Sequence, residues 1–270
     1  ESFSVLSTGG FATHDASFAY YHSTMIDCVA IFFMVLGATN FSLHYRFIVQ
    51  KNFSVHWRDP EFKSYMKFLL LITLVCFIVL VSANVYSHSR AVLNSIFTVV
   101  SISTTTGLVN SAFSTWPTFI PYLLMFVALI GGCGGSTSGG IKFVRALLVR
   151  QHCSNELTRL IHPQAVLMPK LGNQTLSTDI LSSIWSFVAL VVFIFVVLLL
   201  LLLADGLDLT TAFGALAACI SATGASIGGV SSVYEHIPSF SKWVLLIAML
   251  LGRLEIFTVF VLLMPRYWKK

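Results

Sequence analysis

Long apolar stretches and short polar segments alternate along the chain. Four apolar stretches, residues 21–49, 68–86, 180–204 and 241–264, are long enough to cross a hydrocarbon layer of about 30 Å as helices. A fifth, residues 119–149, is interrupted in its middle by glycines. The pattern predicts an all-α integral membrane protein.

One unit recurs within this pattern: a spanning helix, a short apolar helix, a turn rich in Ser, Thr and Gly, and a second spanning helix. The clearest copy has its parts at 68–86, 91–101, 102–110 and from Pro117 onward, and the next copy at 180–204, 210–219, 220–229 and 241–264. Residues 2–6 and 7–15 match the end of a short helix and its turn. We therefore divide the chain into 1–65, the end of one unit, and two further units, 66–170 and 171–270.

The short helices must re-enter the membrane, because about a dozen apolar residues cannot span it. Irregular backbone at membrane depth is tolerated where protein buries it or where it lines a watery cavity. Units repeated around an axis would make that cavity a central pore.

The three turns carry the residues that a dehydrated monovalent cation needs. Ser7-Thr8-Gly9-Gly10-Phe11 aligns with Thr104-Thr105-Thr106-Gly107-Leu108 and with Ser221-Ala222-Thr223-Gly224-Ala225. Backbone carbonyls can replace the water around such a cation, and glycine readily adopts the backbone angles that point carbonyls to one side. One such turn is usually only a turn, but three copies in equivalent places favour an ion filter. The expected ion-binding residues are Thr8, Gly9, Gly10, Thr105, Thr106, Gly107, Thr223 and Gly224.

The interruption of the fifth stretch is the most unusual segment of the chain. The spacing of Gly131, Gly135 and Gly139 also fits a tightly packed helix interface. However, six glycines at up to about 1 kcal/mol each make a continuous helix costly, which favours an unwound intramembrane loop. A phosphate-binding loop is a poor alternative, because Ile141 separates Gly140 from Lys142. The expected loop residues are Gly131, Gly132, Gly134, Gly135, Ser136, Thr137, Gly139 and Gly140, and we expect them to obstruct the pore below the filter.

Arg253 lies near the middle of the last apolar stretch, where an arginine costs about 2.5–3.5 kcal/mol to insert. Glu255 is two residues away and points to another side of a helix, so a simple internal ion pair is disfavoured. Two interpretations remain: a structural contact to carbonyls of a neighbouring helix, or a latch that holds the glycine loop closed and adds a barrier to cations.

Composition and charge agree with a membrane location. Of the residues, 56% are hydrophobic and 10% are charged, whereas soluble domains carry about 25% charged residues. Most Lys and Arg residues fall in three clusters, within 46–67, 142–170 and 266–270, which predicts that these faces are cytoplasmic. The net charge of +5 is thus explained by topology, so nucleic-acid binding is not expected. The opposite side carries more acids, Asp15, Asp205, Asp208 and Glu235, and suits a mouth that concentrates cations.

Catalytic chemistry is not indicated. An enzyme in the membrane would need clustered His, Glu or Asp within the spans, and only isolated acids occur there. The five cysteines form no C-x-x-C pair, which argues against a disulfide framework or a zinc site. The chain begins with Glu1, in what resembles the middle of an element, so we expect it to begin inside a longer protein.

From Phe3 to Trp268 the sequence resembles the C-terminal half to 60% of the TrkH family, the potassium-translocating membrane subunits of bacterial Trk systems, which are related to KtrB and plant HKT transporters. The motifs that carry the resemblance are the first two turns, the 131–140 loop running into Ile141-Lys142, Arg159-Leu160-Ile161-His162-Pro163, and Gly252-Arg253-Leu254-Glu255. The resemblance implies four pseudo-symmetric units around one pore, of which this chain would hold part of the second and all of the third and fourth. In the last turn, Gly224-Ala225-Ser226-Ile227-Gly228 stands where the family has Gly-Pro-Gly-Leu-Gly.

The resemblance also implies partners and a location. It implies a multi-pass protein of the bacterial inner membrane that takes up K⁺ as a homodimer. A cytoplasmic TrkA-like ring would bind NAD(H) or ATP/ADP and regulate the channel through the 131–140 gating loop. The alternative within transport is a sodium-permeable relative or an ion-coupled symporter. In HKT relatives a serine in place of the glycine of the first unit accompanies sodium preference, and that unit is absent from this sequence.

Overall fold

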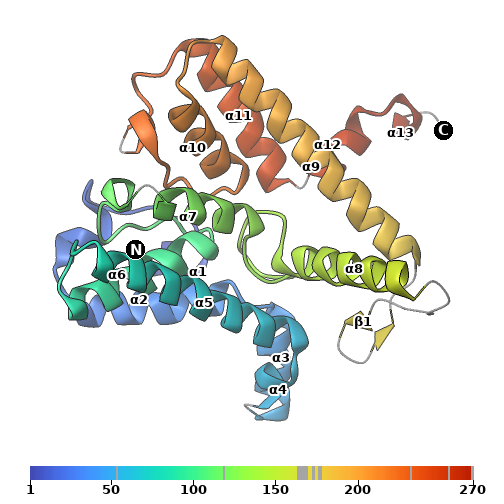
Figure 1. Ribbon diagram of the computed structural model, residues 1–270, viewed down its shortest axis with the longest axis horizontal. Coiled ribbons are helices and arrows are strands. Elements are labelled where there is room, and N and C mark those ends of the chain that lie inside the picture. Colours follow the sequence, from blue (N-terminus) through green and yellow to red (C-terminus); the bar gives the residue numbers. More distant parts are fainter. Residues whose placement is uncertain are drawn as a thin grey trace.

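The computed structural model describes residues 1–52, 54–117, 119–162, 170–171, 174–175, 178–231, 233–254 and 256–268. Helices make up almost all of the regular structure (Figure 1). In chain order they are α1 Ser2–Leu6, α2 Thr24–Gly37, α3 Phe41–Gln50, α4 Ser54–Arg58, α5 Pro60–Ser82, α6 His88–Ser103, α7 Phe119–Ile130, α8 Phe143–Ile161, α9 Thr178–Ala204, α10 Leu209–Ile220, α11 Ser239–Arg253, α12 Ile256–Leu263 and α13 Pro265–Trp268. Three short 3₁₀ helices cover Ser17–Tyr21, Phe113–Thr115 and Gly228–Val230. A two-stranded antiparallel pair, β1 Lys170–Leu171 and β2 Gln174–Thr175, follows α8.

Two continuous helices, α5 and α9, are long and apolar enough to cross a membrane. Helix α5 begins earlier than the apolar stretch alone predicts, because Asp59 caps its first turn by accepting a hydrogen bond from the Phe62 amide at 2.8 Å, and Pro60 occupies a first-turn position. Among the described residues, the number of candidate spans rises to four when two bent helix pairs are each counted as one.

These bent pairs correct two of the sequence predictions. Residues 21–49 are not one straight span, because α2 and α3 meet at 96° around Ala38–Asn40. Asn40 starts the new helix by accepting a hydrogen bond from the Ser42 amide at 2.8 Å. Residues 241–264 are likewise divided between α11 and α12, which meet at 104° after Arg253. Hydropathy gave no sign of either bend, since apolar residues continue on both sides.

The predicted interruption of residues 119–149 is confirmed. Helix α7 ends at Ile130 and α8 begins at Phe143, so residues 131–142 form the connecting loop. A Cβ on Gly131 would collide with the carbonyl oxygen of Gly139, which explains why the loop can fold back on itself only with glycine there.

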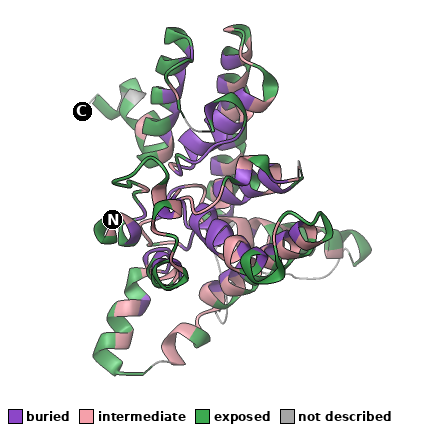
Figure 2. Cartoon of the chain, turned by 90° about the vertical axis from the view of Figure 1, so that its left-hand side faces the viewer, coloured by how far each residue is buried: buried purple, intermediate pink, exposed green. Residues whose placement is uncertain are grey.

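The three short helices α1, α6 and α10 occupy related places in the fold. Helix α6 packs against α5 and α7 and also against α2, while α10 packs against α9 and α11 and also against α7. Helices α6 and α10 therefore each lie between the two helices of their own unit and the second helix of the preceding unit, and α1 packs against α2, the second helix of its own unit. Figure 2 shows buried residues toward the middle of the molecule; α6 and α10 are buried over most of their length, whereas α1 buries only Val5.

Two of the acids expected at the outer mouth have structural partners. Asp205, just after α9, accepts hydrogen bonds from the Ser241 amide at 3.0 Å and the Ser241 hydroxyl at 2.6 Å, and thereby ties α9 to the start of α11. Asp208 caps α10 by accepting from the Thr211 amide at 3.0 Å. Hydrogen bonds from the Thr211 hydroxyl and then from its amide lower the pKa of Asp208 below its ordinary value.

Candidate functional site

The three turns that follow α1, α6 and α10 share one backbone conformation. The last helical carbonyls are capped in the same way in each: Gly9 N bonds Ser4 O at 2.8 Å, Thr106 N bonds Ser101 O at 2.9 Å, and Thr223 N bonds Ala218 O at 2.9 Å. This is the Schellman type of helix end, in which the residue before the donor is left-handed.

The left-handed position is filled by a side-chain-bearing residue in all three turns. Thr8, Thr105 and Ala222 have φ angles of 53°, 57° and 55°. A left-handed residue other than glycine costs roughly 1–2 kcal/mol, so three such residues in equivalent places indicate that the three helix ends hold the same backbone conformation. Two residues later, Gly10, Gly107 and Gly224 have φ angles of 71°, 77° and 80°.

The glycines bring neighbouring turns into direct contact. A Cβ on Gly10 would collide with the carbonyl oxygen of Thr106 and would lie 3.7 Å from that of Thr223. A Cβ on Gly107 would collide with the same Thr223 oxygen. Backbone oxygens from two turns thus converge beside Gly10, and the three turns lie side by side in chain order. A Cβ on Gly224 would meet no atom of the described residues within 4 Å.

The hydroxyl groups of the turns are buried and mutually bonded. Thr106 Oγ1 lies 2.7 Å from Thr104 Oγ1, and the equivalent pair, Thr223 Oγ1 and Ser221 Oγ, is 2.8 Å apart. Thr8, which stands one position earlier in its turn, donates its hydroxyl to Ser7 O at 2.7 Å instead. The Thr106 and Thr223 hydroxyls therefore hold their own turns and leave the backbone carbonyls as the oxygens that meet neighbouring turns.

The turns border a cavity and also contact the 131–140 loop. The cavity, of about 1200 Å³, is lined by Gly10, Gly107 and Gly224, together with Asp15 and with Lys242 and Met249 of α11. No residue of the 131–140 loop lines it; the loop contacts the turns near their starts.

The loop touches all three turns. The Gly139 amide donates to Thr105 Oγ1 at 2.6 Å, and Thr8 Oγ1 lies 3.2 Å from Thr137 Oγ1. A Cβ on Gly139 would collide with the carbonyl oxygen of Ser221. The predicted loop residues and the predicted turn residues, separate in sequence, therefore form one site.

The corner between α2 and α3 also holds the loop, a contact that we did not predict from the sequence. Ala38 O accepts from Cys133 N at 3.0 Å, Gly37 O accepts from Thr137 N at 3.2 Å, and Gly135 O accepts from Phe41 N at 3.1 Å. The bend in the predicted 21–49 span thus frees backbone groups that the loop uses. The available signal was the run Gly37-Ala38-Thr39-Asn40 inside an apolar stretch.

Arg253 is the last residue of α11 and not the middle of a straight helix. Its Nη1 donates to Thr137 O at 3.3 Å, so the side chain reaches the loop. Gly252 beside it lies against α10, where a Cβ would collide with Ile220 O. Glu255 and Pro163, which belong to two of the sequence motifs, lie outside the described residues.

A sequence profile of the TrkH family, described as a cation transport protein, matches residues 1–270. The chain is 40% identical to the Trk system potassium uptake protein TrkH of Vibrio parahaemolyticus, over 99% of this chain and 56% of that protein. It is 38% identical to TrkH of Escherichia coli K12, over 100% of this chain and 56% of that protein. The crystal structure of the potassium transporter TrkH from Vibrio parahaemolyticus matches with a TM-score of 0.94 at 40% identity, over 99% of this chain and 58% of that chain.

The chain spans a little over half the length of these relatives. The relatives are transport proteins, which agrees with the prediction that the chain is not an enzyme. The apolar helices and the match to a membrane transporter agree with the predicted all-α, multi-pass membrane fold. With a profile that matches its whole length and relatives of about 40% identity, the chain belongs to the TrkH family of cation transport proteins.

Proposed function

We propose that the full-length protein takes up K⁺ across the bacterial inner membrane through a filter lined by backbone carbonyls. The observation that carries the proposal is the convergence of carbonyl oxygens from neighbouring turns beside Gly10 and Gly107. Carbonyl rings of this kind replace the hydration shell of a monovalent cation. A fourth turn, from the first unit that the family resemblance implies, would complete the ring beside Gly224.

The loop of residues 131–140 is the proposed gate. Its contacts with the starts of the three turns support this role. The hydrogen bond from Arg253 to Thr137 O supports a role as the latch that keeps the loop closed. A guanidinium there would also repel cations as long as the loop remains in place.

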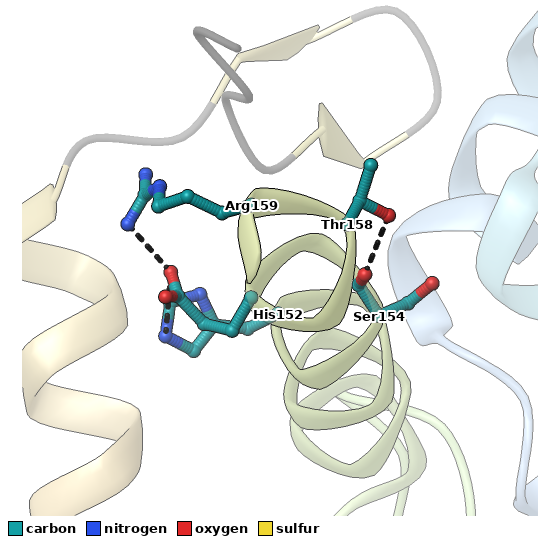
Figure 3. A network of polar contacts seen from close by, with 5 residues as sticks. His152, Ser154, Thr158 and Arg159 are labelled. Carbon is teal, nitrogen blue, oxygen red and sulfur yellow. Dashed lines mark hydrogen bonds and ion pairs between the residues drawn. The ribbon is translucent and has the colours of Figure 1, made fainter. Parts of the chain in front are cut away.

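Regulation by a cytoplasmic partner is the third part of the proposal. The homodimer would be contacted by a TrkA-like ring that binds NAD(H) or ATP/ADP. Helix α8, which follows the loop, would connect it to the basic cytoplasmic face. Figure 3 shows the end of α8, where Arg159 Nη1 lies 2.8 Å from Glu156 Oε1 and His152 Nε2 lies 4.0 Å from the same oxygen. Exposed pairs of this kind contribute little to stability, so they can exchange partners at an interface.

The test uses the full-length protein in liposomes, with K⁺ and Na⁺ fluxes measured separately. Gly107→Ser should lower the K⁺ over Na⁺ ratio by about tenfold or more, since its side chain collides with the Thr223 carbonyl and disturbs the oxygen ring. Gly206→Ser is the matched control, because Gly206 has a similar φ of 91° but, among the described residues, no atom within 4 Å of its would-be Cβ. An unchanged ratio after substitution of Gly10, Gly107 and Gly224 would refute the filter.

The same measurements address the alternative of a sodium-permeable channel or an ion-coupled symporter. Equal K⁺ and Na⁺ fluxes in the wild-type protein would favour the sodium-permeable alternative. K⁺ accumulation that requires an imposed H⁺ or Na⁺ gradient would favour symport.

A further inference from the structure

Glu61, in the first turn of α5, reaches the loop with its carboxylate. Its Oε1 accepts a hydrogen bond from the Gly134 amide at 2.6 Å, and the side chain is only 7% exposed. A charge-assisted bond of this length is among the stronger contacts available to a backbone amide. Gly134 lies in the first part of the loop, after the end of α7.

The same carboxylate also faces the start of α8, where the loop ends. Val144, in the first turn of α8, lies beside the same glycine, since a Cβ on Gly134 would be 3.2 Å from Val144 Cγ1 and 3.7 Å from Glu61 Oε1. A carboxylate at the beginning of a helix is favoured, because the free amides there carry partial positive charge. Glu61 thus lies where three segments meet: α5, the first part of the loop and the first turn of α8.

Lys142 closes the loop from the other side. It precedes α8 with a φ of 79°, and its Nζ donates to the carbonyl oxygens of Ser136 and Ser138. Lys142 also interacts electrostatically with Glu61. The loop therefore lies between an acid anchored on α5 and a base that moves with α8.

We propose that Glu61 is a positioning residue for the gate: it fixes the loop in its pore-side conformation and makes that conformation depend on the place of α8. A displacement of α8 would move Val144 and Lys142 away from Glu61. It would thereby weaken the hydrogen bond between the Glu61 carboxylate and Gly134 N and release the loop from the turns. This inference rests on the proposed role of the loop as the gate.

Cys133 provides a readout that does not depend on ion flux. It is adjacent to Gly134, its side chain is 1% exposed, and its amide bonds Ala38 O. Cys76 and Cys219 are also buried, at 0% and 7%, whereas Cys28 and Cys153 are exposed. In the full-length protein with Cys28→Ser and Cys153→Ser, the rate of labelling of each cysteine by a small membrane-permeant maleimide can be followed by peptide mass spectrometry.

Three variants are compared in that background: Glu61→Ala, Glu61→Gln and Asp59→Ala. Glu61→Ala should raise the labelling rate of Cys133 on the order of tenfold, the change expected for the loss of one hydrogen bond to a charged group. Glu61→Gln keeps an acceptor oxygen without the charge and should give a smaller increase. Asp59→Ala is the matched control, because Asp59 caps α5 through Phe62 N and has no loop amide as its partner in the described structure. Cys76 and Cys219 should label at the wild-type rate throughout.

The outcomes separate the positioning role from the gate. An unchanged Cys133 rate in Glu61→Ala overturns the inference, and so does a parallel rise at Cys76 and Cys219, which would mean that Glu61 supports the whole fold. K⁺ flux in liposomes is measured on the same preparations. A selective rise at Cys133 with unchanged flux supports the positioning role of Glu61 and refutes the loop as the gate.

Discussion

The turns and the loop are both irregular backbone at the centre of the molecule, but they are held in opposite ways. Each turn is fixed mainly by its own short helix, through amide bonds back to Ser4, Ser101 or Ala218. The loop is fixed by distant residues, among them Glu61, Ala38 and Arg253. A locally determined conformation persists when its neighbours move, whereas one determined from outside is lost when its partners leave.

This difference agrees with the proposed roles of the turns as the filter and of the loop as the gate. A filter must keep its carbonyl positions while the gate opens, so its turns depend little on the elements that move. A gate must have a second state within reach, and the glycine-rich loop depends on external partners that can move away from it. Substitutions in the turns should therefore change selectivity, and substitutions around the loop should change basal flux.

Removal of residues 134–137 should have the largest effect on basal K⁺ flux. If the closed protein is open in about 1–10% of molecules, loss of the obstruction raises basal K⁺ flux by about ten- to a hundredfold. Flux is measured in liposomes without the cytoplasmic partner and normalised to folded protein. A folded deletion variant with ordinary or lower flux would show that the loop is not the gate.

Arg253→Ala should raise basal flux by about tenfold with little change in the K⁺ over Na⁺ ratio, since it removes a charged donor to Thr137 O. Lys keeps the charge but loses the planar fork, so Arg253→Lys should fall in between. Arg159→Ala, which removes only the exposed pair with Glu156, is the matched control (Figure 3). Lower thermal stability with no excess flux per folded molecule would instead support a purely structural role for Arg253.

Thr105 lies in a turn and also contacts the loop, so its substitution tests whether the two regions act separately. Its Oγ1 accepts from Gly139 N at 2.6 Å, so Thr105→Val leaves a buried amide without that partner, at a cost of about 1–3 kcal/mol. We expect basal flux to rise several-fold with a smaller effect on selectivity. Thr105→Ser restores the oxygen and should restore the wild-type flux. A variant in which only selectivity changes would mean that the turn, too, depends on the loop.

Asp208 should have the smallest effect, because it stabilises only the start of α10. Asp208→Ala should lower the free energy of unfolding by about 1 kcal/mol and leave basal flux and selectivity unchanged. The pKa of Asp208 is lowered in the folded protein, so its contribution is present above about pH 4 and is lost as pH falls through the lower folded value. Thermal unfolding of wild type and variant should thus differ at pH 7 and converge on stronger acidification. A difference that persists in strong acid would exclude the carboxylate as its cause.

Much of the fold followed from the sequence, since its periodicities report on local structure. The short helices α6 and α10 were expected at 91–101 and 210–219 and occur at His88–Ser103 and Leu209–Ile220. The alignment of the three turns by residue type agrees with their shared φ angles. The helix break after Ile130 followed from glycine content alone.

Local features could be predicted from the sequence: apolar helices, short helices, three equivalent turns and one unwound loop. Each follows from a property of neighbouring residues, such as hydrophobic length or the cost of glycine in a helix. Three features could be seen only in the folded structure. Helices α2 and α3 bend at Ala38–Asn40, the loop contacts all three turns, and Glu61 reaches Gly134. These features depend on pairs of backbone groups far apart in the chain, which hydropathy and composition do not encode, because any exposed carbonyl or amide can pair with any other that packing brings within reach.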